Sequence, residues 1–130
     1  MKSDLNDFQD KVDELLIRHK SILDSLSKYQ ETNSKVNRAI IKSITFCGCV
    51  TVNASSQNIP EDASLKDYKK YVDTHFSGKL CEQCKDIIEE KMGNNLFYLV
   101  ALTNLLELDL DEILKKEMDK INTLGHFNLT

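Results

Sequence analysis

Residues 80–106 read LCEQCKDIIEEKMGNNLFYLVALTNLL, and this stretch predicts one long helix. At about 100° per residue, the first half of such a helix has two distinct faces. One face is acidic and carries Glu82, Asp86 and Glu89. The opposite, inward face carries Leu80, Cys81, Cys84, Ile87, Ile88 and Met92. Beyond Gly93, the run Leu96–Leu102 is apolar on nearly all sides, which predicts a central, buried helix.

The two cysteines of this stretch have counterparts earlier in the chain. Cys81 and Cys84 form a C-x2-C pair, Cys47 and Cys49 form a C-x-C pair, and the chain has no other cysteine. Two close pairs brought together by a fold supply four thiolates for a tetrahedral zinc ion, with Zn–S bonds of about 2.3 Å. We therefore predict a structural zinc site at these four residues. Four thiols without a ligand, or a reversible dithiol switch, are the alternatives, and His126 is a spare potential ligand.

The rest of the chain predicts further helices with short connections, because it contains one proline and four glycines. Apolar residues spaced by three and four predict an amphipathic helix over residues 4–30, and a second helix could run over residues 33–44. Capping patterns predict a short helix that starts at Ser64 and closes at Gly78, and a final helix over residues 109–125. We expect an all-α protein, a bundle of four to five helices in one domain over residues 1–130.

One cysteine-bearing loop is expected between these helices, over Cys47–Glu61. It contains Gly48 and the single proline, Pro60. Within it, Val50–Val52 has strand character, but so short a strand has no evident partner in the sequence.

Composition excludes several classes of function. The chain has 130 residues, 41% of them hydrophobic, and 17 basic against 21 acidic side chains give a net charge of −4. An acidic balance does not favour a nucleic-acid-binding surface, and the longest apolar run is far shorter than the roughly 20 residues that span a membrane. The segment Met1–Asp7 is polar and carries no apolar signal core, so we expect a cytoplasmic protein with reduced thiols.

Polar residues of the long helix are further candidates for a site. Lys91, Asn94 and Asn95 fall on or beside its inward face, where structural, hydrogen-bonded amides are the default interpretation and a ligand site is the alternative. The acidic face, with Glu82, Asp86, Glu89 and Glu90, could hold Mg²⁺ through carboxylate oxygens. A solvated helix face explains these carboxylates equally well.

A family resemblance follows from the second half of the chain. GNNLFYLVAL at 93–102, LELDLDE at 106–112 and KEMDKIN at 116–122 resemble the second half of the MazG-like nucleoside triphosphate pyrophosphohydrolases. In that all-α family, a helix bearing E-x-x-D continues into L-F-Y-L, and a short turn leads to a lysine-rich helix. The resemblance covers about a third of the chain and implies a MazG-like helical fold.

The departures from the family pattern concern its catalytic carboxylates. Family enzymes hold Mg²⁺ with an E-E-x-x-E helix and the E-x-x-D helix. Here the E-x-x-D positions fall on Lys91 and Asn94, and E-E-x-x-E aligns with residues 31–35, where only Glu31 of three carboxylates survives. Protonated lysine cannot ligate Mg²⁺, so the resemblance implies the family fold without its usual catalytic site.

The leading hypothesis is therefore a non-catalytic, MazG-like module that is stabilised by a four-cysteine zinc site and acts in binding or regulation. A homodimer is expected, because the short elements of the chain cannot cover a long apolar helix, and a nucleotide or a protein is the expected partner. One rival is a Mg²⁺-dependent pyrophosphohydrolase that uses the acidic face, with Asn94 and Asn122 holding the nucleotide. The other rival is a thiol-based redox sensor.

Overall fold

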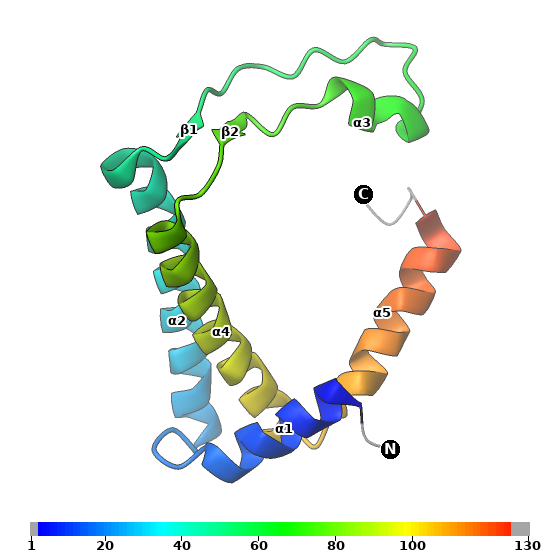
Figure 1. Cartoon of the computed structure of the whole chain (residues 1–130). Helices are drawn as coiled ribbons and strands as arrows, with labels where there is room; N and C mark the ends of the chain where they lie inside the picture. Colours follow the sequence, from blue (N-terminus) through cyan, green and yellow to red (C-terminus); the bar gives the residue numbers. More distant parts are fainter. Residues whose placement is uncertain (1–2, 126–130) are drawn as a thin grey trace.

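The computed structural model describes residues 3–125, and within them the chain is mostly helical (Figure 1). Two three-residue strands, β1 and β2, form the sheet of this region. The elements are α1 Asp4–Leu15, α2 Ile22–Lys42, β1 Val50–Val52, α3 Tyr68–Tyr71, β2 Phe76–Gly78, α4 Glu82–Leu105 and α5 Leu110–Leu124. The predicted predominance of helices is confirmed.

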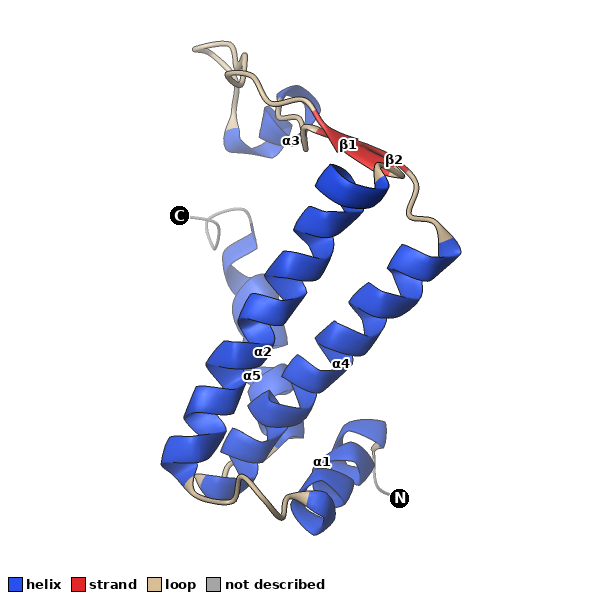
Figure 2. Cartoon of the chain, turned by 90° about the vertical axis from the view of Figure 1, so that its left-hand side faces the viewer, coloured by secondary structure: helices blue, strands red, loops and turns tan. Residues whose placement is uncertain are grey.

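Helices α2 and α4 lie side by side and antiparallel, and they form a long hairpin (Figure 2). Asn95 of α4 links the two helices, because its side-chain amide donates to the carbonyl of Tyr29 at 3.4 Å, to Thr32 Oγ1 at 3.1 Å and to Asn33 Oδ1 at 2.7 Å. The default interpretation of Asn95 as a structural, hydrogen-bonded amide is confirmed.

The apolar core lies where α1 crosses the C-terminal half of α4. Val12 and Leu16 pack there against Val100 and Ala101, and all four are buried. Phe8, Phe97, Tyr98, Leu105 and Leu110 pack around this cluster. From this point α5 diverges from the hairpin, so that the helices outline an open V (Figure 1).

The predicted helix over residues 4–30 is wrong as one continuous element. α1 ends at Leu15, α2 begins at Ile22, and Leu16 has an extended backbone between them. The Ser25 hydroxyl donates to the carbonyl of His19 across this connection. The break lets α1 fold across α4 and bury Val12, which a straight helix could not do. The second predicted helix, over 33–44, is the continuation of α2.

Strand β1 has a partner, contrary to the sequence prediction. It pairs antiparallel with β2, with Val50 opposite Gly78 and Val52 opposite Phe76. The predicted helix over residues 64–78 is also too long, because helical turns cover only residues 65–71. Pairing with β1 draws Phe76–Gly78 into an extended conformation, and the Gln57 side chain forms two 2.9 Å hydrogen bonds to the backbone of Asp73.

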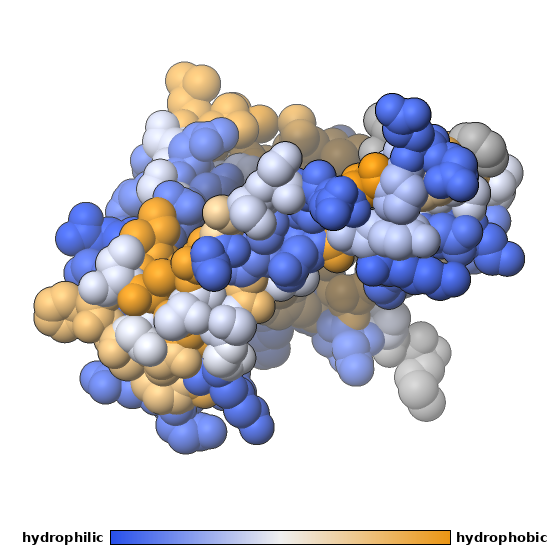
Figure 3. Space-filling model, turned by 90° about the horizontal axis from the view of Figure 1, so that it is seen from above, coloured by the Kyte–Doolittle hydropathy of each residue, from blue (hydrophilic) through white to orange (hydrophobic). Residues whose placement is uncertain are grey.

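Residues 53–75, called the arm here, project from this two-stranded ladder and carry α3 (Figure 1). Both ends of the arm therefore meet at the ladder, next to the end of α2 and the start of α4. Seen from above, apolar side chains gather at this end of the hairpin (Figure 3).

The ends predicted for the last helix are confirmed. Asp109 caps α5 by accepting from the backbone N–H of Asp111 at 2.9 Å, and Gly125 follows its last residue with a positive φ of 54°. The prediction of a buried central helix holds for Val100 and Ala101, but Leu96 and Leu99 expose 46% and 38% of their surface. The other elements of the chain cover only part of the circumference of α4.

Candidate metal centre

The C-x-C pair lies in a tight reversal at the end of α2. Residues Ser43–Cys47 form one wide helical turn, and the N–H of Gly48 closes it by donating to the carbonyl of Ser43 at 3.0 Å. Gly48 has a φ of 79°, a left-handed conformation that residues with a Cβ adopt at a cost. This reversal brings the thiols of Cys47 and Cys49 to the same side of the chain.

The C-x2-C pair lies at the start of α4. Cys81 is the N-cap of the helix, and its Sγ accepts from the backbone N–H of Cys84 at 3.4 Å. The free N–H groups of a helix N-terminus favour negative charge, so a thiolate is stabilised at this position. Cys84 lies one turn further and presents its thiol to the same site.

All four Sγ atoms lie within 4.8 Å of one another, and Cys47 Sγ is 3.8 Å from Cys81 Sγ. Four sulfurs bound at about 2.3 Å to one tetrahedral ion are about 3.8 Å apart. The cysteines are free thiols, of which Cys47 is exposed and the other three are partly buried. The predicted set of four residues is brought together as one possible metal site.

The β1–β2 ladder fixes the distance between the two cysteine pairs. It connects the residue after Cys49 to the segment that leads into Cys81. Gly78 permits this close approach, because it has a φ of 96° and a Cβ at its position would lie 2.8 Å from the carbonyl oxygen of Cys49. Val50, on the other strand of the ladder, is fully buried.

The four thiols influence one another's ionisation. The hydrogen bond from the backbone N–H of Cys84, and then the thiol of Cys84 itself, lower the pKa of Cys81 to about 7. The proximity of Cys81, together with burial, raises the pKa of Cys84 to about 12. Thiols this close resist ionising together unless a cation lies between them, and a divalent metal ion would favour the thiolate form of all four.

The acidic face of α4 forms no comparable group. Glu82, Asp86, Glu89 and Glu90 are exposed, and Glu89 lies 4.0 Å from the ammonium of Lys85. Within residues 3–125, the cysteine cluster is the one set of three or more His, Cys, Asp or Glu side chains placed closely enough to hold a metal ion. A magnesium site on this face stays a prediction without geometric support.

The candidate ligand-binding residues are spread over two diverging helices. Lys91 is partly buried in α4, Asn94 is exposed on α4, and Asn122 is exposed near the end of α5. α5 diverges from α4 along its length, so the fold does not gather these three residues (Figure 1). His126 lies outside the described residues.

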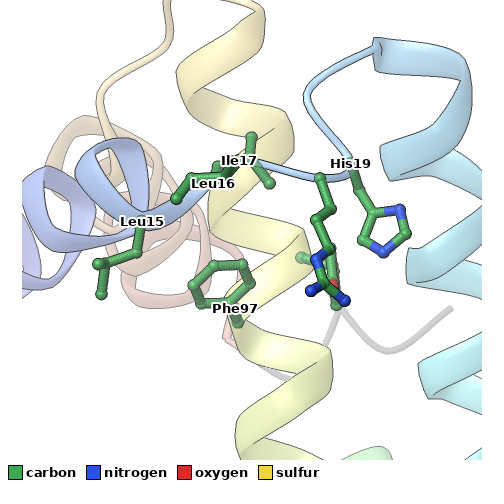
Figure 4. Close-up of a pocket in the computed structure, with 7 residues that line it drawn as sticks. Leu15, Leu16, Ile17, His19 and Phe97 are labelled. Atoms are coloured by element: carbon green, nitrogen blue, oxygen red, sulfur yellow. The ribbon is translucent and has the colours of Figure 1, made fainter.

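A hollow of about 620 Å³ that the sequence did not predict lies at the break between α1 and α2, and it is lined by residues 15–19, Phe97 and Tyr98 (Figure 4). His19 lies at its edge, with Nδ1 2.6 Å from Asp24 Oδ2. A smaller hollow of about 400 Å³ lies beside the cysteine cluster, between Phe46 and Ile87. Neither could be predicted, since both depend on where α2 starts and ends.

No protein-family model, curated protein or solved structure matches this chain. Among the described helices, none has the length and apolar character needed to cross a membrane.

Proposed function

We propose that this protein is a non-catalytic, MazG-like helical module that a structural zinc ion stabilises and that acts in binding or regulation. The observation that carries the proposal is the convergence of all four cysteine sulfurs within 4.8 Å. Zinc is the metal that most often takes four thiolate ligands in a structural role. Free thiols remain available for zinc in a reducing compartment, so a cytoplasmic location is part of the proposal.

The proposed role of zinc is to join elements that share little apolar surface. Cys47 and Cys49 lie at the end of α2 and the start of the ladder, whereas Cys81 and Cys84 begin α4. The buried apolar core lies towards the other end of α4, where α1 crosses it. A metal bound at the cysteine end would close the hairpin there, and its binding free energy would become folding free energy.

The loss of catalysis is supported by the surroundings of Glu31, the one carboxylate that survives from the family pattern. Its two oxygens lie 3.0 Å from the ammonium groups of Lys28 and Lys35. These lysines lower the pKa of Glu31, so its negative charge is already compensated by side chains of its own helix. On α4, Lys91 and Asn94 occupy the positions where the family pattern has carboxylates. We propose a nucleotide or a protein as the partner, bound without hydrolysis.

An assay for pyrophosphohydrolase activity tests directly whether catalysis is absent. The metal-loaded protein is incubated with Mg²⁺ and each of the common nucleoside triphosphates, and released pyrophosphate is measured. We expect no release above that of a protein-free control. Pyrophosphate release that Asp86→Asn or Glu89→Gln abolishes would establish the alternative site on the acidic face.

The redox-sensor alternative has one observation in its favour, the 3.8 Å separation of Cys47 Sγ and Cys81 Sγ. A disulfide between them would remove two ligands and release the metal. Circular dichroism before and after mild peroxide treatment tests this alternative. We expect the zinc-bound protein to keep its helicity, and a reversible loss would support the sensor.

Thermal unfolding with and without metal tests the structural role itself. Removing zinc with a chelator is expected to lower the melting temperature by at least about 10 °C. A shift of this size is expected because the domain would lose several kcal/mol of metal-binding free energy. Cys84→Ser should lower the melting temperature similarly and make it insensitive to the chelator. Identical melting of metal-loaded and chelated protein would refute a structural metal.

We also propose that the module is a homodimer. The buried core of the described chain contains few large side chains, and two of its long helices expose apolar stripes.

A further inference from the structure

The C-terminal half of α4 has apolar residues on three sides, and within residues 3–125 the other elements cover two of these sides. The side with Asn95 faces α2, and the side with Val100 and Ala101 faces α1. The third side carries Met92, Leu96 and Leu99, which expose 38–49% of their surface, and it ends at Thr103, which is buried and accepts a hydrogen bond from Gln9 of α1. The spacing of four and three residues between these apolar side chains is that of a helix seam that packs against another helix.

Helix α5 exposes a second apolar stripe. Ile113, Leu114, Met118 and Ile121 expose 41–48% of their surface, and α5 has no buried residue. The stripe starts at Leu110, which packs against the core cluster, and Ile113, Leu114 and Ile121 continue on the same side of the helix. An amphipathic helix of this kind gains stability in water chiefly by packing its apolar side.

The surface area of the chain indicates how much is left uncovered. The molecule exposes 10146 Å², whereas a compact monomer of 14.9 kDa exposes about 7,000 Å². The arm accounts for part of this excess of about 3,000 Å². Half of the excess, about 1,500 Å² per chain, lies within the range of about 1,000–2,500 Å² that each partner buries in an obligate homodimer.

We propose that the α4–α5 face, defined as these two apolar stripes, is covered by the same face of a second copy related by a two-fold axis. An aliphatic seam is complementary to itself, as an isologous contact requires. The net charge of −4 and the mixed charges of α5 disfavour an anionic membrane or a nucleic acid as the occupant. The inference rests on the proposed homodimer, adds its interface, and is independent of the metal.

Light scattering of the metal-loaded full chain, combined with substitutions, tests the proposal. We expect a mass of twice 14.9 kDa for the unaltered protein. Leu96→Glu and Met118→Glu place a carboxylate in the proposed interface and should weaken the dimer by about 100-fold or more. Leu23→Glu is the matched control: Leu23 is a helix residue that is 73% exposed outside the face, and its replacement should leave the dimer unchanged.

The possible outcomes distinguish a failure of the homodimer from a failure of the α4–α5 face alone. A monomeric unaltered protein would overturn the homodimer and the interface together. A dimer that resists both substitutions, or that Leu23→Glu dissociates, would overturn the α4–α5 face alone. Metal content is measured on the same samples, so the zinc site is tested independently of the dimer.

Hydrogen exchange on the unaltered protein provides a test that does not depend on whether the variants fold. In a dimer paired through this face, the backbone amides of α5 should exchange about as slowly as those of α2. In a chain whose α5 packs only on α1, the amides of α5 should exchange at least about tenfold faster than those of α2. If the sample is dimeric but the amides of α5 exchange at least about tenfold faster than those of α2, the proposed face is contradicted.

Discussion

At the residue scale, two glycines make the cysteine cluster possible. Gly48 supplies the left-handed reversal between Cys47 and Cys49, and Gly78 lets the second strand approach the carbonyl of Cys49. Both glycines have a positive φ, a backbone conformation that residues with a Cβ rarely adopt. The sequence shows these glycines but not their roles, because the role of Gly78 depends on a strand pairing that the sequence did not predict.

We predict that Gly78→Ala destabilises the metal-loaded protein by about 1–3 kcal/mol, through backbone strain and a clash with Cys49. Gly93→Ala is the matched control, because Gly93 lies inside α4 with no atom within 4 Å of an added Cβ. It should stabilise the protein by about 0.5–1 kcal/mol. Urea unfolding measures both, and equal stabilities for the two variants would contradict the close approach at Gly78.

The cysteines should also differ in reactivity when the metal is removed. With a pKa lowered to about 7, Cys81 should react with iodoacetamide at a rate that is half-maximal near pH 7 and levels off about one pH unit above it. With a pKa raised to about 12, Cys84 should react more slowly, and its rate should still increase above pH 9. Mass spectrometry of the alkylated peptides distinguishes the two, and faster labelling of Cys84 at neutral pH would contradict the geometry.

At the element scale, the cysteine cluster lies where four elements meet. The end of α2, the two strands and the start of α4 all converge there, and the arm begins and ends at the ladder. A metal in the cluster would therefore fix the base of the arm as well as the hairpin. Within residues 3–125, the hydrogen bonds of the arm lie inside the arm or at its junction with the ladder, such as the two between Gln57 and Asp73.

We predict that removing the metal exposes the arm to proteolysis. Limited digestion should cleave within residues 53–75 at least about tenfold faster in chelated than in metal-loaded protein, because the base of the arm opens more often. Cleavage within α2, between residues 22 and 42, provides the internal reference. If chelation accelerates cleavage equally in both segments, the metal stabilises the whole chain and has no particular effect on the arm.

The sequence predicted the elements with strong local signals. The span of α4, the Asp109 cap, the Gly125 end and the four candidate ligands follow from periodicity, capping and cysteine spacing. The break at residues 16–21 has no glycine or proline to mark it, and tertiary packing of Val12 and Leu16 determines it. The pairing of β1 with β2 is a contact between segments far apart in the chain, which a three-residue strand does not encode locally.

At the scale of the whole molecule, the chain has a small core for its length. The main buried cluster consists of Val12, Leu16, Val100 and Ala101, and the V outlined by α4 and α5 is open (Figure 1). A chain of this size with a limited core gains stability from a metal or from a partner subunit. We propose that these two contributions act in different regions, with zinc at the cysteine end of the hairpin and a second copy at the α4–α5 face.

The most direct test of the central claim is the metal content of the protein, measured together with its accessible thiols, after purification without chelator or added metal. The account predicts about one zinc per chain, with four thiols that react only after denaturation or chelation. Protein without bound metal, whose four thiols react freely in the folded state or are paired as disulfides, would contradict it.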